Sequence, residues 1–242
     1  MSDYLQFLAN VGIGGAHPGG LPLTKAVLAN ETIEKTAHVL DLGCGTGQTS
    51  AFLAKQYGCQ VTALDVEKKM LEKAQQRFDR EQVAIPLVES SAEQLPFKAP
   101  MFDFIIAESV IAFTEAEKAL QQCFRALKNG GRLIAIEMTK AAEHSLSAEE
   151  EKQIQSFYGV KKIMTEQEWR SKMQDAGFET IFVMDFGETY SKKGLEEMSE
   201  LTLTRQFDFR DLCIWVEHQE WMAKLRNRLT YRVYKAIKSV KT

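Results

Sequence analysis

The stretch that decides the fold is VLDLGCGTGQTS, residues 39–50. Its first four residues are typical of a strand, and three glycines follow at alternate positions, Gly43, Gly45 and Gly47. A helix-like segment comes next. A glycine-rich turn directly after a strand lets the backbone approach a bound molecule closely, because no side chain stands in the way. The stretch therefore predicts a strand, a ligand-binding turn and a helix.

Strands and helices alternate from about residue 36 onward. Apolar runs predict strands at 38–42, 60–65, 85–90, 102–108, 132–138 and 178–186. Helices are expected at 49–57 (ending at Gly58), at 67–80, and from Thr114 and Thr165, where a Glu three residues later makes a capping box. Asn129-Gly130-Gly131 is expected to close the helix from Thr114. The alternation predicts an α/β fold, a doubly wound, mostly parallel, Rossmann-like sheet with helices on both faces.

Three stretches lie outside this alternation. Residues 1–35 contain the loop sequence AHPGGLP and are expected to form an N-terminal lid or cap. Residues 140–163 interrupt the pattern between a cofactor-binding core, 36–139, and the remainder of the α/β core, 164–186, and we expect this insert to cover a substrate. Residues 187–242 carry apolar side chains at three- and four-residue steps, which predicts a C-terminal helical extension that continues to the end of the chain.

Composition limits the class of protein. The chain of 242 residues has a net charge of −3, which does not point to nucleic acid or an anionic membrane as a partner. No apolar run approaches the roughly 20 residues of a membrane span, and the N-terminal residues do not resemble a secretory signal. The four cysteines are scattered, which suits a reducing compartment and offers no zinc cluster. We therefore expect a cytoplasmic protein that has no metal site.

Two acids indicate what the glycine turn holds. A nicotinamide-binding turn needs a small residue where this chain has Gln48, so a pyrophosphate is not favoured there. Asp41 lies just before the glycines and suits a positively charged group. Asp65 ends the second strand, where a carboxylate can accept both hydroxyls of a ribose. Together these residues favour a nucleoside that carries an ammonium group, such as S-adenosylmethionine.

Five motifs in order resemble those of the class I S-adenosylmethionine-dependent methyltransferases. They are VLDLGCGTGQTS, the acid in TALDVEKKML, SSAEQLPF, FDFIIAES and LKNGGRL, and they extend over roughly residues 36–138. GFETIFVMDF resembles the late strand of the same family. The resemblance implies transfer of a methyl group from S-adenosylmethionine, with S-adenosylhomocysteine as the product.

The resemblance also implies which residues contact the cofactor. They are Asp41, Gly43, Gly45, Asp65, Val66, Met70, Ser91, Ala92, Glu93 and Glu108. The first three would line the methionine end, Asp65 the ribose, the next two the faces of the adenine, and residues 91–93 its edge. Glu108 and Ser109 would lie near the transferred methyl group. Met70 could equally belong to the core, and Ser91 stands where family members often have an acid.

A hydroxyl or ammonium acceptor would need a general base. His17, Glu108 and Glu137 are the candidates, because each lies in a loop or at a strand end that faces the expected site. Each also has a purely structural reading, as a loop histidine or a solvated strand end. The expected acceptor pocket draws on the three irregular stretches, which together hold the aromatic residues Tyr4, Phe7, Phe157 and Tyr158, with Phe113 after the fourth strand.

The function expected from the sequence is methyl transfer to a small molecule by direct in-line attack. One alternative is an RNA methyltransferase that uses the basic stretch 224–241, in which Tyr231 and Tyr234 are interleaved. A second is a protein that binds S-adenosylmethionine without catalysis, and a third is an NAD-linked dehydrogenase. Neither the acceptor nor the choice between monomer and homodimer follows from the sequence.

Overall fold

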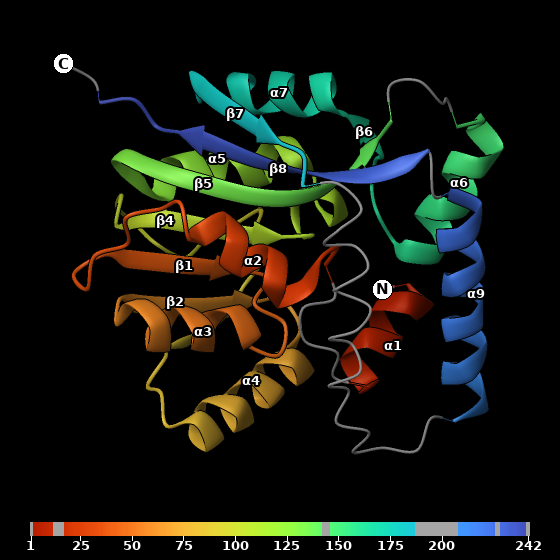
Figure 1. The fold of residues 1–242 in the computed structure, drawn as a ribbon, viewed down its shortest axis with the longest axis horizontal. Coiled ribbons are helices and arrows are strands. Elements are labelled where there is room, and N and C mark those ends of the chain that lie inside the picture. The colour runs from red at the N-terminus through yellow and green to blue at the C-terminus, as the bar shows by residue number, and fades with distance from the viewer. Residues whose placement is uncertain (1, 12–16, 142–145, 187–207, 226–227, 241–242) are drawn as a thin grey trace.

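The computed structural model describes residues 2–11, 17–141, 146–186, 208–225 and 228–240. Its centre is an eight-stranded sheet in the order β3-β2-β1-β4-β5-β8-β7, with β6 paired to β5 (Figure 1). Strands β1 to β6 run parallel, and β8 is antiparallel to both β5 and β7. The strands are β1 His38–Leu42, β2 Gln60–Asp65, β3 Leu87–Glu89, β4 Phe102–Glu108, β5 Leu127–Lys140, β6 Met164–Thr165, β7 Thr180–Met184 and β8 Leu229–Ile237.

Helices cover both faces of the sheet, as the sequence predicts. One hydrophobic core packs α2, α3 and α4 against one face, and a second packs α5 and α7 against the other and extends to α1, α6 and α9. The helices are α1 Asp3–Val11, α2 Gly20–Leu28, α3 Gln48–Tyr57, α4 Lys68–Glu81, α5 Ala116–Ala126, α6 Ala148–Tyr158, α7 Glu166–Asp175 and α9 Phe209–Leu225, with a 3-10 turn η1 at Ile111–Phe113. None of the helices in the described residues combines the length and apolar character that a bilayer span requires.

The local signals in the sequence are confirmed in several places. Strand β4 has the predicted bounds, and α3 ends at Gly58, whose φ of +64° is left-handed. Helix α7 begins with the predicted capping box: the Thr165 hydroxyl accepts from the Glu168 backbone N–H, and the Glu168 carboxylate accepts from the Thr165 backbone N–H. These features depend on neighbouring residues alone, which is why the sequence is sufficient for them.

The same spacing fails at Thr114. Helix α5 begins after Glu115 without a side-chain cap, and the Thr114 hydroxyl donates instead to the Ile111 carbonyl in the preceding η1 turn. The helix also ends at Ala126, earlier than predicted, because residues 127–131 already belong to β5. Gly130 and Gly131 lie in that strand, where they exchange backbone hydrogen bonds with Lys238.

The prediction of helix to the end of the chain is wrong over residues 229–237. These residues form β8, which lies between β5 and β7 in the sheet. Tyr231 and Tyr234 are both buried, with 6% and 0% of their surface exposed. Residues 229–237 therefore do not form the basic helix on which the RNA alternative relied, and two buried rings cannot stack on nucleotide bases. Residues 187–207 of the expected extension lie outside the described residues.

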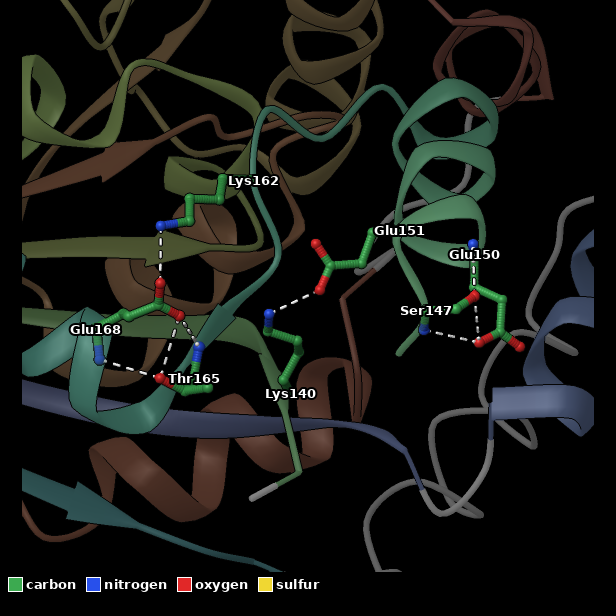
Figure 2. A network of polar contacts seen from close by, with 7 residues as sticks. All are labelled: Lys140, Ser147, Glu150, Glu151, Lys162, Thr165 and Glu168. Carbon is green, nitrogen blue, oxygen red and sulfur yellow. Dashed lines mark hydrogen bonds and ion pairs between the residues drawn. The ribbon is translucent and has the colours of Figure 1, made fainter. Parts of the chain in front are cut away.

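The insert at 140–163 contains α6, which polar contacts attach to the end of the sheet (Figure 2). Lys140, the last residue of β5, donates to the Glu151 carboxylate at 2.7 Å. Ser147 and Glu150 form a second capping box at the start of α6. The insert is thereby held beside the carboxyl ends of β5 and β6, and Figure 1 shows α6, α1 and α9 beyond that edge of the sheet.

Replacing Thr165 by Ala tests the capping box that orients α7. We expect Thr165→Ala to lower the free energy of unfolding by about 1 kcal/mol, and the melting temperature by about 2–4 °C, because the Glu168 N–H loses its acceptor. Thr114→Ala is the matched control, since its hydroxyl caps no helix, and should cost less than half as much. Equal losses in thermal unfolding of the two variants would contradict the assigned helix starts.

Candidate functional site

Three carboxylate side chains lie close together at the carboxyl ends of three neighbouring strands, which we call the carboxyl edge of the sheet. Strands β1, β2 and β4 are parallel neighbours, and Asp41, Asp65 and Glu108 lie at or next to their last residues. Asp41 and Asp65 are buried, and the Glu108 side chain is 8% exposed. Buried carboxylates that lie close together repel one another and lack the solvation of water. Ionisation of these carboxyl groups is therefore costly, and a cationic ligand would offset that cost.

The glycine turn lies between these acids, and its three glycines have left-handed φ angles for different reasons. A Cβ on Gly43 would lie 2.3 Å from a methyl carbon of Val110, and one on Gly47 would lie 2.6 Å from the Phe78 ring. A Cβ on Gly45 would meet no heavy atom within 4 Å. Close packing therefore leaves no room for a side chain at Gly43 or Gly47. At Gly45 the space beside the backbone is open.

Asp41 is the most deeply buried of the three acids. The Ser50 hydroxyl, on α3, donates to its carboxylate at 2.5 Å. Burial, with added repulsion from Glu108, raises the pKa of Asp41 to about 7, although the Ser50 hydrogen bond acts in the opposite direction. A cation bound nearby would favour the ionised carboxylate, so binding there would be coupled to loss of a proton.

Asp65 holds the turn and the next helix together. One carboxylate oxygen accepts from the Gly45 backbone N–H and the other from the Glu67 N–H, both at 2.9 Å. Burial raises the pKa of Asp65, and these backbone hydrogen bonds lower it. The adjoining Val66 side chain is 63% exposed, which is unusual for a large apolar residue at a strand end. Met70 is partly buried and packs against the core, as its structural reading proposed.

The loop after β3 is organised by its own polar side chains. The Ser91 hydroxyl accepts from the Glu93 backbone N–H, and the Glu93 carboxylate accepts from the Glu115 N–H. Ala92 is buried in the core. Residues 91–93 thus form an ordered loop after β3, and a hydrogen bond links this loop to Glu115 at the start of α5. The hydrogen bonds of its side chains are made within the protein. A role in ligand binding is therefore supported only by the position that the sequence predicts for the loop.

Glu108 joins three segments that are far apart in the sequence. Its carboxylate accepts from the Thr24 hydroxyl on α2 at 2.5 Å and from the Thr49 hydroxyl on α3 at 2.7 Å. The His17 Nε2 lies 3.3 Å from the same carboxylate, while His17 Nδ1 faces the Pro18 carbonyl at 3.2 Å. His17 and Glu108, both predicted as site residues, are therefore brought together. Each ring nitrogen of His17 faces an acceptor oxygen.

Glu137 faces backbone amides. It is fully buried in β5, and its carboxylate accepts from the N–H groups of Val110, Ile111 and Ala112 at 2.8–3.2 Å. Burial raises the pKa of Glu137 to about 7 in spite of these hydrogen bonds. The side chain fixes the η1 turn directly after Glu108. This geometry does not fit the proton-accepting role that the sequence suggested for Glu137.

Sequence reasoning missed the hydroxyl residues of the site. Thr24, Thr49 and Ser50 supply the donors for Glu108 and Asp41, and all three are buried. The consecutive Thr49 and Ser50 directly after the glycine turn are the one signal that could have indicated them. Thr24 has no such signal, because α2 reaches the site only through the fold.

Aromatic rings gather where α1, α6 and α9 meet beyond the sheet edge. The Tyr4 ring centroid lies 4.9 Å from that of Tyr158 and 5.6 Å from that of Phe157. Trp215 lies near Phe7, and the Tyr158 hydroxyl is 3.0 Å from His218 Nδ1. Burial lowers the pKa of His218 to about 4, so this imidazole is neutral at physiological pH. Four of the predicted aromatics are thus brought together, whereas Phe113 lies in η1.

Comparison with known proteins places this arrangement in a family. The model of a methyltransferase domain matches residues 39–131. The uncharacterized methyltransferase YodH of Bacillus subtilis (strain 168) is 41% identical over 184 residues, 76% of this chain and 78% of that protein.

Solved structures share the fold at low identity. A phosphoethanolamine N-methyltransferase 2 of Haemonchus contortus, in complex with phosphomonomethylethanolamine and S-adenosylhomocysteine, has a TM-score of 0.81 at 18% identity. The match covers 98% of this chain and 57% of the nematode protein, so this chain spans little more than half of it. The [4+2]-cyclase SpnF has a TM-score of 0.80 at 21% identity, with 98% of this chain and 93% of that chain covered.

The raised pKa of Asp41 predicts a pH-dependent stability. A carboxyl whose pKa is raised in the folded state binds its proton more tightly folded than unfolded, so its contribution is lost as the pH rises from about 4 through about 7. We expect the melting temperature of Asp41→Asn, relative to the unsubstituted protein, to increase by about 5–10 °C between pH 5 and pH 8, because about two pKa units at about 1.4 kcal/mol each are lost over that range.

Asp103→Asn is the control for this measurement. Hydrogen bonds from the His38 N–H and Lys128 lower the pKa of Asp103 below its ordinary value, so this carboxylate is ionised throughout that range. Its difference from the unsubstituted protein should not change with pH. An Asp41→Asn difference that is equally constant would show that Asp41 ionises freely in the fold.

Proposed function

This chain belongs to the class I S-adenosylmethionine-dependent methyltransferases, and we propose that it transfers the methyl group directly to a small-molecule acceptor. The single observation that carries the proposal is the position of the buried acids beside the open backbone at Gly45. Repulsion among Asp41, Asp65 and Glu108 is relieved by a cationic ligand and increased by a pyrophosphate. A sulfonium that carries an ammonium group fits this edge.

Features of the turn itself support the fit. The side-chain hydroxyl of Thr46 is buried and has no hydrogen-bond partner among the described residues. Gly45 leaves room for a ligand beside it, and the exposed Val66 side chain offers an apolar surface next to Asp65. Buried polar groups are normally paired, and an exposed apolar side chain at a strand end suits the face of an adenine.

We assign the cofactor contacts as the family motifs imply. Asp41, Gly43 and Gly45 would face the methionine end. Asp65 would accept from the ribose hydroxyls with the lone pairs that its two backbone hydrogen bonds leave open. Val66 and Met70 would flank the adenine, and the loop that holds Ser91, Ala92 and Glu93 would border its edge.

S-Adenosylmethionine supplies a methyl group that is already electrophilic, so the protein chiefly has to align the acceptor. We propose that His17, Glu108 and Glu137 contribute to this alignment as positioning residues. Glu108 fixes α2 and α3 through Thr24 and Thr49, and Glu137 fixes the turn that follows Glu108. Their oxygens already accept hydrogen bonds, and both nitrogens of His17 face acceptors, which disfavours each as a general base.

A small acceptor is supported from two sides. The aromatic cluster of α1, α6 and α9 lies beyond the carboxyl ends of the strands (Figure 1), and the structurally similar Haemonchus contortus enzyme is solved with phosphomonomethylethanolamine. The buried Tyr231 and Tyr234 count against RNA. A water-poor site would strengthen the interaction of the buried acids with the sulfonium.

Incubation with methyl-labelled S-adenosylmethionine and a fractionated metabolite extract tests the proposed function. We expect label in a low-molecular-mass fraction, identified by mass spectrometry, in amounts that depend on the enzyme. Label that appears in RNA, or in no fraction at all although the cofactor binds, would contradict the proposed small-molecule methyl transfer.

Two glycine variants separate binding from folding. Gly45→Ala places a methyl group in the open space at the turn, and we expect it to weaken S-adenosylmethionine binding at least about tenfold in calorimetric titration. Gly43→Ala has a similar φ but collides with Val110, so its main effect should be a lower melting temperature. Binding by Gly45→Ala that equals that of the unsubstituted protein would argue against a ligand at this turn.

Replacing His17 by Ala distinguishes positioning from general-base catalysis. We expect His17→Ala to lower the rate of label incorporation about tenfold at every pH from 6 to 9, because the loss of packing at Glu108 does not depend on pH. A general base would be active only when deprotonated. A rate ratio that approaches one at pH 6 and grows steeply toward pH 9 would therefore restore the catalytic role of His17.

A further inference from the structure

Helix α1 is held at its C-terminal end by a lysine from another helix. Lys73 Nζ, on α4, donates to the backbone carbonyls of Ala9 and Asn10 at 2.7 and 2.8 Å. The last carbonyls of a helix have no partner within it and carry partial negative charge. No basic residue lies in the last turn of α1 itself. Lys73 therefore supplies the cap that the sequence of α1 lacks.

The contact lies beside the proposed cofactor site. Helix α4 begins three residues after Asp65, and a groove of about 630 Å³ separates its first turn from α1. The groove is lined by Gln6, Ala9, Asn10, Glu67, Lys68, Lys69 and Glu72. One wall of this groove thus comes from a helix that Lys73 attaches to the other wall.

The opposite end of α1 contacts the elements on the acceptor side. The Ser2 hydroxyl donates to the Tyr158 carbonyl at 2.9 Å, and Asp3 pairs with Arg210 on α9 at 2.8 Å. Tyr4 packs against both Tyr158 and His218. Figure 1 shows α1 between the edge of the sheet and α9. Helix α1 therefore connects α4 with α6 and α9.

We propose that Lys73 is a positioning residue that docks α1 against α4, and that α1 thereby covers the groove beside the proposed cofactor site and sets the position of the aromatic cluster of α1, α6 and α9. The inference rests on the proposed function, because the groove matters only if the cofactor binds beside it. Because Lys73 already holds α1 in place, cofactor binding does not have to order this helix. The affinity for the cofactor is therefore higher with Lys73 than without it. The sequence predicts core and adenine contacts for the helix of Lys73, but no contact between Lys73 and α1.

Lys73→Met removes the two hydrogen bonds and keeps most of the aliphatic side chain. We expect it to weaken binding of S-adenosylhomocysteine about tenfold in calorimetric titration, while the melting temperature changes by less than about 3 °C. Lys73→Arg, which can still donate to both carbonyls, should restore the affinity to within about threefold. Arg80→Met is the control, because Arg80 is an exposed cation on the same helix that does not line the groove.

Hydrogen exchange gives a second readout that does not depend on ligand binding. In Lys73→Met, amides of residues 3–11 should exchange at least about fivefold faster, whereas those of α3 should be unchanged. Unchanged exchange in α1, or an equal loss of affinity in Arg80→Met, would overturn the proposal. If the unsubstituted protein fails to bind S-adenosylhomocysteine, the proposed function fails, while exchange in α1 still decides whether Lys73 docks the helix.

Discussion

The mutual repulsion of Asp41, Asp65 and Glu108 is the constraint on which the rest of the site depends. Parallel pairing of β1 with β2 and β4 brings the three carboxylates to one edge, and the fold must supply donors for them. Ser50 and Thr49 come from α3, Thr24 from α2, and two backbone N–H groups come from the glycine turn and α4. Helices α2 and α3, which cover one face of the sheet, thus donate hydrogen bonds to the carboxylates that we propose select the ligand.

Much of this arrangement follows from sequence alone. Continuous apolar runs separated by amphipathic helices fix a parallel sheet, and a parallel sheet brings its strand ends together. The positions of Asp41, Asp65 and Glu108 at one edge are therefore predictable, as is the role of glycine between them. The capping box was predicted correctly at Thr165, whereas the same spacing at Thr114 fails because its hydroxyl donates to the preceding η1 turn.

The prediction for residues 229–237 was wrong, and the hydrogen bonds of Glu137 were missed, because both depend on residues that are distant in the sequence. Strand β8 is covered on both faces, so Tyr231 and Val233 on one face and Tyr234 and Ala236 on the other are all buried. This removes the alternation that marks a strand, and Leu229, Val233 and Ile237 recur instead at the spacing of a helix. The sequence placed Glu137 on its strand correctly. Its carboxylate, however, accepts hydrogen bonds from the backbone amides of residues 110–112, which lie about 25 residues earlier in the chain. These hydrogen bonds are visible only in the folded chain.

If the buried carboxyl groups beside the open backbone at Gly45 determine what binds, the site should prefer a cationic adenosyl compound to a pyrophosphate. Calorimetric titration of the same protein sample with S-adenosylmethionine and with nicotinamide adenine dinucleotide tests it most directly, because both ligands contain adenosine and differ in charge. We expect one saturable site for S-adenosylmethionine and no measurable binding of the dinucleotide at millimolar concentration. Saturable binding of the dinucleotide, with none of the sulfonium compound, would contradict it.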